Sequence, residues 1–301
     1  MIEVCLVGTG GMMPLPGRWL SSLAVRTGGQ GVLFDCGEGT QIALREAGWG
    51  FRAIDALCFS HLHADHVGGV VGVLFTLANS GREEAIDLYG PPGLAKVVAG
   101  QRLIAPWLPF EVRCHELAAG DAFQVGEFHG YCAWGRHKVP CLAYRLDLPR
   151  RPRFDPERAR QLGVPVELWE RLQDGQSVGW EGRIAQPQDV LGPPRRGLSV
   201  AYMTDTRPSP DLVSLAAEVD LLVCGATFGD PADQPRALDT DHMTFTEAAE
   251  MAKQAGARRL WLTHFSPAMP HPEEYLELAQ SVFPATVLGH DGMPGILRFE
   301  A

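Results

Sequence analysis

The chain has 301 residues, of which 46% are hydrophobic and 21% charged, and its formal net charge is −10. This composition is typical of a globular protein with a large core, and the length predicts one large domain or two small ones. The negative charge argues against binding of polyanions through bulk charge, although it leaves room for a local basic site. No apolar run is long enough to cross a bilayer, which argues against a membrane protein.

The N-terminus and the cysteines both favour a cytoplasmic protein. Residues 1–11, MIEVCLVGTGG, contain neither a basic region nor a cleavage site, so we expect no secretory signal peptide. They predict a first strand followed by a glycine turn. The seven cysteines are scattered and include no CxxC pair. Such a set fits reduced thiols better than a disulfide framework.

Short apolar runs with strand character alternate with helical stretches along most of the chain. We expect strands within residues 2–10, 23–27, 31–37, 56–60, 86–92, 142–148, 198–205, 220–228, 259–266 and 295–300. Amphipathic periodicity predicts helices within residues 40–48, 67–81, 209–219, 244–256 and 272–282. This alternation predicts an α/β protein, with a layered αββα arrangement as one form of it.

Residues 147–197 differ from the rest of the chain and are called the arm below. They are rich in Pro, Gly and Arg, and their nine Arg against eight acidic residues give a local net charge of +1. We expect an insertion that stands off the body of one domain, residues 1–301, and not a separate domain. Its Arg150, Arg151 and Arg153 are candidate phosphate contacts, and a solvated loop is the plain alternative.

Three histidines and an aspartate crowd into the stretch HLHADH, which follows the apolar run 56–60 and precedes a predicted helix. The ligand-type residues are His61, His63, Asp65 and His66. The first two histidines alternate around Leu62, so both rings can point the same way from an extended backbone. Imidazole and carboxylate are the ligands that zinc and its neighbours prefer. Four ligands in six residues exceed what one tetrahedral ion takes from so short a loop, which favours two metals.

HLHADH matches the HxHxDH signature of the metallo-β-lactamase superfamily, and further motifs resemble ribonuclease Z, the endonuclease that trims the 3′ side of precursor tRNA. The similar stretches follow in order along nearly the whole chain: residues 7–22, 33–41, 88–93, 204–208 and 262–267. HxHxDH alone identifies only the superfamily, whereas LFDCGEGTQ together with DTRP and LTHFSP is more specific. The resemblance implies a four-layer αββα metallo-β-lactamase sandwich with an inserted arm.

The resemblance also implies a site for two divalent metal ions. It assigns one ion to His61, His63 and His137, the second to Asp65, His66 and His264, and a bridging role to Asp205. From the residues alone, His129 competes with His137, and Asp205 could be an ordinary turn residue. Zn²⁺ is the first choice of metal, with Mn²⁺ and Fe²⁺ as alternatives, because His and Asp ligands accept all three.

The chemistry implied is hydrolysis of a phosphodiester by a hydroxide that bridges the two metals. The departing oxygen then needs a proton, and the resemblance assigns that step to His242, with Asp65 as the other candidate catalytic residue. Asp35 is expected to lie behind the ligands and to fix a metal-binding histidine or its loop.

The chain departs from the family pattern where that proton is delivered. The family commonly carries a HEAT-like stretch whose Glu supports the catalytic histidine, but residues 224–227 here read CGAT. Gly225 therefore stands where the Glu would be, and we expect His242 to be a weaker proton donor. In the arm, VELWERL at residues 166–172 replaces a Gly-Pro-rich core of the family.

Three functions follow from these observations. Precursor tRNA 3′ endonuclease is the leading hypothesis. The first alternative is a ribonuclease Z-like enzyme that hydrolyses a small phosphodiester or a sulfate ester. The second alternative is a non-catalytic binding protein with a degenerate site, against which the full ligand set argues. The resemblance further implies a homodimer, and nothing in the sequence indicates a membrane partner.

Overall fold

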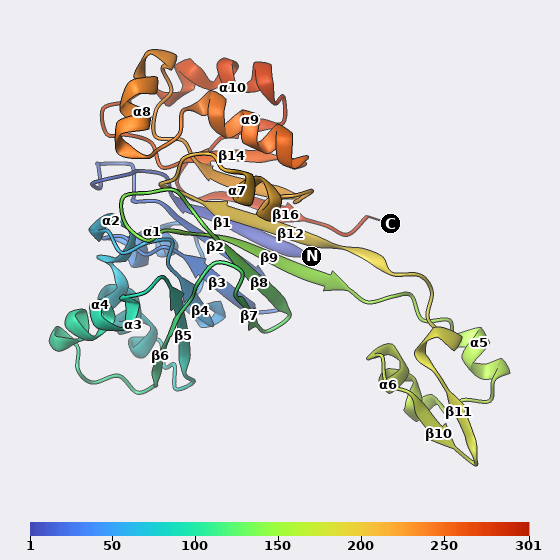
Figure 1. The fold of residues 1–301 in the computed structure, drawn as a ribbon. Coiled ribbons are helices and arrows are strands. Elements are labelled where there is room, and N and C mark those ends of the chain that lie inside the picture. Colours follow the sequence, from blue (N-terminus) through green and yellow to red (C-terminus); the bar gives the residue numbers. More distant parts are fainter. Residues whose placement is uncertain (301) are drawn as a thin grey trace. The chain divides into compact units, whose positions relative to one another are not determined.

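Two seven-stranded sheets pack face to face in the computed structural model, which describes residues 1–300 (Figure 1). The first sheet runs in the order β16 (Met293–Leu297), β1 (Ile2–Gly8), β2 (Ser22–Thr27), β3 (Gln30–Phe34), β4 (Ala56–Cys58), β5 (Ile86–Gly90) and β6 (Val112–Glu116). The second runs in the order β15 (Thr286–Leu288), β14 (Leu260–Thr263), β13 (Leu221–Gly225), β12 (Arg195–Met203), β9 (Leu142–Arg150), β8 (Phe128–Trp134) and β7 (Ala122–Val125).

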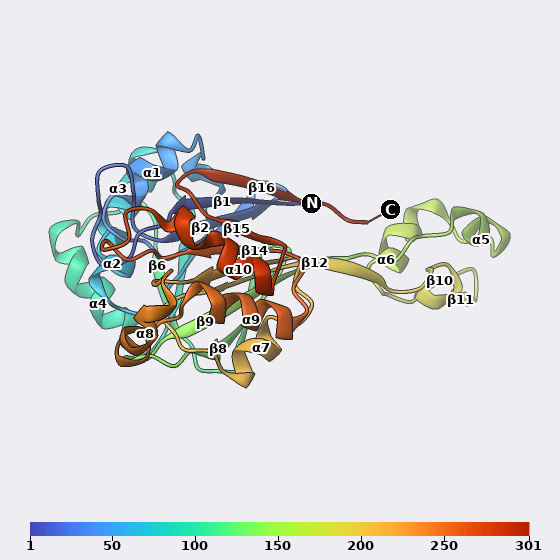
Figure 2. The ribbon, with the colours of Figure 1, turned by 90° about the horizontal axis from the view of Figure 1, so that it is seen from above.

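Helices cover the outer face of each sheet. The first sheet packs against α1 (Thr40–Glu46), α3 (Val70–Asn79) and α4 (Leu94–Gln101). The second packs against α7 (Pro210–Leu215), α9 (Phe245–Ala255) and α10 (Leu276–Val282). The two helical groups stay apart when the molecule is seen from above (Figure 2). Because apolar side chains fill all three spaces between layers, this αββα arrangement confirms the predicted fold.

Both sheets are mixed, and their parallel parts position the site. Strands β3 to β6 are parallel neighbours in the first sheet, and β12 to β15 are parallel neighbours in the second. The carboxyl ends of parallel strands meet at one edge of a sheet, where α/β proteins commonly bind ligands. The sequence motifs at residues 61–66 and 204–208 follow β4 and β12, and the motif at 262–267 spans the end of β14, so all three lie at such ends.

The remaining elements are short. They are α2 (Ala64–Val67), α8 (Gln234–Thr240) and the 3₁₀ turns η1 (Phe51–Ala53), η2 (Arg102–Ile104), η5 (Pro231–Asp233) and η6 (Pro272–Tyr275). The predicted helix at 67–81 thus starts at Val70, and α2 forms a separate turn before it. No helix within residues 1–300 is both long and apolar enough to span a membrane.

Residues Pro149–Gly197, which are nearly the whole arm, form a second compact unit. It contains α5 (Pro156–Gln161), η3 (Val166–Leu168), α6 (Trp169–Gln173), the hairpin β10 (Val178–Trp180) and β11 (Arg183–Ala185), and η4 (Pro187–Asp189). Six buried side chains make its own small apolar cluster: Ala159, Val164, Leu172, Val178, Ala185 and Val190. This Pro/Gly-rich segment therefore has a small apolar core of its own.

Candidate metal centre

Four loops bring the candidate ligands together, and three of them directly follow a strand of a parallel pair. The loop after β4 carries HLHADH, the loop after β12 carries Asp205, and the loop after β14 carries His264. His137 comes from the connection between β8 and β9. Packed core fixes the end of each strand, so side chains that directly follow a strand are held in position more firmly than side chains within a long loop.

The first group of ligand-type atoms comes from His61, His63 and His137, which lie within 4.8 Å of one another. Nε2 of His61 lies 2.8 Å from Nδ1 of His63, and Nε2 of His137 lies 3.4 Å from the same Nδ1 atom. The competitor His129 is exposed in β8 and belongs to none of the ligand groups within residues 1–300. The structure therefore gathers His137, and not His129, with the two histidines of the motif.

The second group comes from Asp65, His66 and His264. Nε2 of His66 lies 3.3 Å from Nε2 of His264, and Oδ2 of Asp65 lies 3.4 Å from the first nitrogen and 3.7 Å from the second. Both histidines are buried, whereas Asp65 is partly exposed. The structure thus brings the residues of each expected ligand set together in space.

Asp205 joins the two groups. Its carboxylate is buried, and Oδ2 lies 2.7 Å from Nε2 of His66 and 3.6 Å from Nε2 of His61. Its other oxygen, Oδ1, lies 3.1 Å from Nδ1 of His264. One carboxylate thus reaches ligands of both groups, which is the geometry that a bridging residue needs.

The chemistry of this donor set fits divalent cations. Burial and the neighbouring His66 hold the pKa of His61 well below its usual range, so its imidazole is neutral and offers a lone pair. Burial alone would raise the pKa of Asp205, yet His264 and His66 lower it well below the ordinary value. Nδ1 of His137 is buried with no hydrogen-bond partner among the described residues. The neutral imidazole of His61 and the buried carboxylate of Asp205 are both ligand types that a divalent metal ion binds.

Known proteins match this chain from end to end. A model of the β-lactamase superfamily domain matches residues 30–265. Ribonuclease Z of Lachnoclostridium phytofermentans is 44% identical over 301 residues, covering 100% of this chain and 99% of the relative, and that of Clostridium kluyveri is 42% identical over 302 residues, covering all of both. The chain belongs to the ribonuclease Z family. Human tRNase Z, short form, has the same fold, with a TM-score of 0.72 at 24% identity over 99% of this chain and 100% of that one.

In this member of the ribonuclease Z family, Asp35 lies directly behind the ligands. Its buried carboxylate accepts hydrogen bonds from the main-chain N–H of Ser60 at 2.7 Å, the Ser60 hydroxyl at 2.8 Å and the Tyr202 hydroxyl at 2.9 Å. Its Oδ2 atom also lies 2.8 Å from Nδ1 of His66. With Nδ1 held by Asp35, Nε2 of that histidine faces Asp205 at 2.7 Å.

The backbone of this ribonuclease Z chain is unusual at the same residues. Asp35, Asp205 and His264 have φ values of 53°, 48° and 60°, a region that non-glycine residues seldom adopt. Such conformations cost free energy and persist where the surrounding structure imposes them, often at functional sites. Gly11 lies against one of them, because a Cβ there would come within 2.6 Å of the His264 ring.

His242 also contacts the carboxylate of Asp205, since its Nε2 lies 2.8 Å from Oδ1. Its other nitrogen, Nδ1, lies 2.7 Å from the main-chain oxygen of Thr240. Gly225, which is expected at the family's Glu position, is buried, and a Cβ there would lie 3.0 Å from Cα of Thr204. A side chain at position 225 would therefore meet Thr204, while Nδ1 of His242 contacts a backbone carbonyl.

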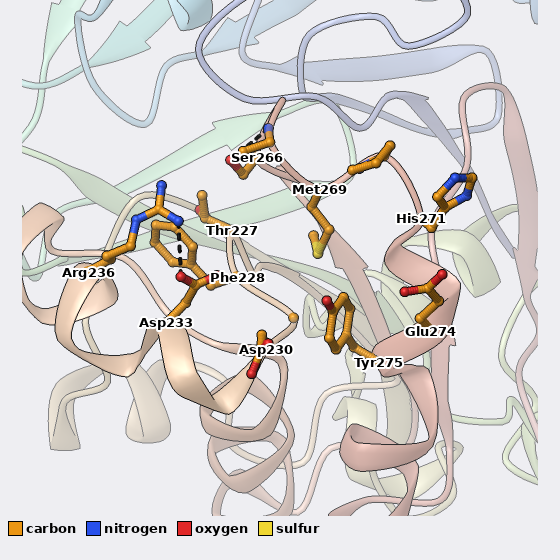
Figure 3. Close-up of a pocket in the computed structure, with 13 residues that line it drawn as sticks. Thr227, Phe228, Asp230, Asp233, Arg236, Ser266, Met269, His271, Glu274 and Tyr275 are labelled. Atoms are coloured by element: carbon orange, nitrogen blue, oxygen red, sulfur yellow. Dashed lines mark hydrogen bonds and ion pairs between the residues drawn. The ribbon is translucent and has the colours of Figure 1, made fainter.

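A pocket of about 280 Å³ adjoins the centre (Figure 3). It is formed by the loop after β13, η5 and α8, and the loop after β14 with η6. Its wall contacts the centre twice: Thr227 Oγ1 lies 3.1 Å from Nδ1 of His264, and the ring of Phe228 lies 6.4 Å from that of His242, centroid to centroid. No sequence motif predicts this pocket, because its walls come from separate loops.

The predicted substrate-binding arginines belong to the arm. Arg150 is the last residue of β9, while Arg151 and Arg153 are exposed. The guanidinium of Arg151 lies 3.0 Å from the carboxylate of Asp174 in the same unit. Exposure leaves Arg153 accessible to a phosphate, whereas Arg151 would have to exchange its acidic partner.

Proposed function

We propose that this protein is a metal-dependent endoribonuclease that cleaves precursor tRNA at its 3′ side. The observation that carries the proposal is the convergence of two ligand groups on Asp205, in a chain that matches curated ribonuclease Z sequences over its whole length. An ester bond of RNA is a phosphodiester, and paired divalent ions are well suited to its hydrolysis.

The ligands are assigned as the geometry groups them. His61, His63 and His137 would hold one ion, Asp65, His66 and His264 would hold the other, and Asp205 would take part in both sites. Two divalent ions bound there, with Zn²⁺ as the first choice, supply an activated water and stabilise charge on the phosphate oxygens. Asp35 keeps His66 in its orientation, and the carboxylate of Asp65 lies beside the rings of His66 and His264, with which it would hold the second ion.

His242 is the proton donor to the departing oxygen. Its Nε2 atom faces the centre beside Asp205, and its Nδ1 proton is held by the Thr240 carbonyl. Burial lowers the pKa of this imidazole, but the Asp205 carboxylate raises it above its ordinary value. A protonated imidazole at the rim of the metal centre can serve as a general acid.

The pocket of Figure 3 receives the base of a nucleoside that flanks the scissile bond. It combines the aromatic rings of Phe228 and Tyr275 with the carboxylates of Asp230 and Glu274. Aromatic faces stack on bases, and carboxylates accept hydrogen bonds from base amino groups but repel phosphates. The exposed Arg153 of the arm is the better candidate for a phosphate contact.

The finer assignments of assembly and location are also proposals. The exposed apolar residues Leu103, Ile104 and Trp107, which are 81%, 84% and 91% exposed, support a homodimer through this segment. The seven free cysteines support a cytoplasmic location. Replacement of Trp107 by Ser should shift the dimer to a monomer in light scattering if this segment is the interface.

The deciding experiment compares two substrates with the purified, metal-loaded protein. One is a precursor tRNA with a 3′ trailer, and the other is bis-p-nitrophenyl phosphate. Cleavage of the RNA at one defined 3′ position supports the proposal. Hydrolysis of the small diester without RNA cleavage would favour the small-ester alternative, and a protein that binds no zinc, manganese or iron would favour the non-catalytic one.

A further inference from the structure

The loop that presents His242 is shaped by the end of α8. Asp241 ends that helix with φ 57° and ψ 41°, and the N–H of His242 donates to the carbonyl of Ala237 at 2.9 Å. The same turn places the Thr240 carbonyl 2.7 Å from Nδ1 of His242. This closing pattern of a helix C-terminus fixes both the main chain and one ring nitrogen.

A buried guanidinium holds the loop from its other side. Arg207 is 7% exposed, and its Nη1 donates to the main-chain oxygen of His242 at 2.5 Å. The same nitrogen donates to Oε2 of Glu247 at 2.8 Å, while Nη2 donates to Oε1. A planar guanidinium can bind a carboxylate with two donors and still serve a carbonyl, which a lysine cannot do.

Glu247 is itself held by the segments around His242. Its Oε2 accepts the N–H of Thr244 at 2.9 Å, and its Oε1 accepts the side-chain N–H of Gln234 at 2.7 Å. These contacts tie the first turn of α9 and the start of α8 to Arg207. The loop between the two helices, which carries His242, is therefore fixed at both ends.

The main chain beside Arg207 joins this loop to the metal centre. The N–H of Arg207 donates to the carbonyl of Arg136 at 3.1 Å, and Thr206 Oγ1 accepts the N–H of Arg136 at 2.7 Å. Arg136 directly precedes His137. Residues 205–207 thus connect the bridging carboxylate, the loop of a metal ligand and the loop of the proton donor.

We propose that Arg207 is a positioning residue for proton transfer and acts through His242. With Glu247 and the Thr240 carbonyl it takes the orienting role that a carboxylate at position 225 would fill. The inference rests on the proposed function of His242 as proton donor. As a hydroxide oxygen bonds to phosphorus and the bond between phosphorus and the leaving 3′ oxygen breaks, the Nε2 proton moves to that leaving oxygen, and the neutral imidazole keeps its Nδ1 proton on the Thr240 carbonyl.

The consequence is selective. An RNA 3′ oxygen is a poor leaving group and depends on the proton, whereas p-nitrophenolate leaves without one. A displacement of a catalytic group by about 1 Å can cost about 10²-fold in rate. Loss of Arg207 should therefore slow RNA cleavage and leave an activated diester nearly untouched.

The test compares Arg207→Gln, His242→Ala and the double variant as metal-loaded proteins. Arg207→Gln should lower kcat on precursor tRNA by about 10²-fold, with unchanged metal content and an unchanged rate on bis-p-nitrophenyl phosphate. The double variant should be no slower than His242→Ala, because groups that act as one unit are not additive. Equal losses on both substrates, or losses that multiply in the double variant, would overturn the proposal.

A matched control is Arg82→Gln. The Arg82 side chain is 8% exposed against 9% for Arg207, and it donates to the carbonyls of Ile54 at 2.6 Å and Ala85 at 2.8 Å. Arg82→Gln removes similar hydrogen bonds from a guanidinium to backbone carbonyls, but none of them involves the His242 loop. It should therefore change the rates on the two substrates by the same factor. If Arg207→Gln does not fold, Glu247→Gln keeps the shape of the pair without its charge and should give a smaller loss of the same selectivity.

Failure of the endonuclease assignment can be told apart from failure of the role of Arg207. If the wild-type protein cleaves no precursor tRNA, the endonuclease assignment fails, but diphenyl phosphate and bis-p-nitrophenyl phosphate still test the positioning. Arg207→Gln should then lose more rate on the phenyl ester, whose leaving group is the poorer one. Parallel losses on both esters would sink the role of Arg207 as well.

Discussion

The hydroxyl of Tyr202 donates a 2.9 Å hydrogen bond to the carboxylate of Asp35, across 167 positions of sequence. Tyr202 lies in β12 of the second sheet, and Asp35 follows β3 of the first. The two sheets are thus joined by a buried polar contact directly behind the candidate metal centre. The same oxygen of Asp35 contacts His66, so the packing of the sheets is coupled to the position of a candidate metal ligand.

Asp35→Asn tests this support. An amide cannot provide the same negative partner for the His66 ring, and loss of such a partner typically lowers metal affinity about 10–100-fold. Competition with a chelator measures that affinity. Tyr202→Phe is the control, because it removes one donor and keeps the carboxylate, and its effect should be clearly smaller. Wild-type affinity in Asp35→Asn would mean that the carboxylate does not orient a ligand.

Asp205→Ala should lower the metal content below the expected two ions per chain and abolish turnover. The reason is that Asp205 contacts both ligand groups and provides the buried negative charge between them. Metal analysis of the purified protein and the diester assay provide the two measurements. Asp220→Ala, which removes another buried carboxylate that accepts the N–H of Ser199 at 2.8 Å, should keep its metals. Full activity in Asp205→Ala would refute a bridging role.

Gly225 gives a prediction about stability. A Cβ at this position would lie 2.9 Å from Oγ1 and 3.0 Å from Cα of Thr204, and the second atom cannot move without the backbone. Gly225→Ala should therefore lower the free energy of unfolding by about 1–3 kcal/mol, the usual cost of overpacking. Denaturant unfolding measures this, with Gly256→Ala as a comparison at an uncrowded glycine whose φ of 64° adds its own strain.

The same geometry changes an expectation drawn from the sequence. Gly225→Glu alone should not raise RNA cleavage, because Thr204 occupies the space that the new side chain needs. The departure at Gly225 also does not leave His242 without an orienting partner, since the Thr240 carbonyl contacts its Nδ1. A rise in RNA cleavage by Gly225→Glu would show that the loop can rearrange to admit a carboxylate.

The sequence predicts the fold well, and it singles out ligand-type residues that the structure brings together, for a physical reason. The strands Leu221–Gly225 and Leu260–Thr263 are fully buried and pair in parallel, and the second is followed directly by His264. His61, Asp205 and His264 stand close behind such strands, so local sequence marks both the strand and its chemistry. The strands β6, β7 and β8 escape prediction, because they are edge or near-edge strands with mixed burial.

Contacts made over long sequence distances are not predictable in this way. The bonds of Arg207 to Glu247 and to the His242 carbonyl join residues 40 and 35 positions apart, and no local pattern indicates them. The contact of the Thr240 carbonyl with His242 is made by a backbone atom, so the identity of the side chain at position 240 does not predict it. The small core of the arm is not predictable from the sequence for a different reason, because its few apolar residues are spread among Pro, Gly and Arg.

The cysteines should react slowly in the native protein. Burial raises the pKa of Cys5 and of Cys132 to about 11, so at pH 8 only about one thiol in a thousand is the reactive thiolate. Labelling by iodoacetamide should therefore speed up as the pH rises toward 11. Cys114 is the only free cysteine among the described residues that is not buried, and it should react first; Cys114→Ser should remove that phase. Rapid labelling of several thiols at neutral pH would contradict this burial.

Removal of the arm should separate RNA binding from catalysis. β9 and β12 are neighbours in the second sheet, so a short Gly-Ser linker in place of residues 151–194 can join them. The deleted residues have their own apolar cluster, and the body keeps its three core clusters. We expect the shortened protein to fold, to hydrolyse bis-p-nitrophenyl phosphate at the wild-type rate and to show a higher KM for precursor tRNA.

A double variant of the intact arm, Arg151→Ala with Arg153→Ala, distinguishes charge from shape. If these arginines contact phosphates, the double variant should reproduce part of the rise in KM. It should also reduce the salt dependence of RNA binding, because binding through fewer phosphate contacts releases fewer counterions. If the arm acts through its folded surface, the double variant should bind RNA like the wild type while the deletion does not. Unfolding of the shortened protein would show instead that the arm belongs to the core of the molecule.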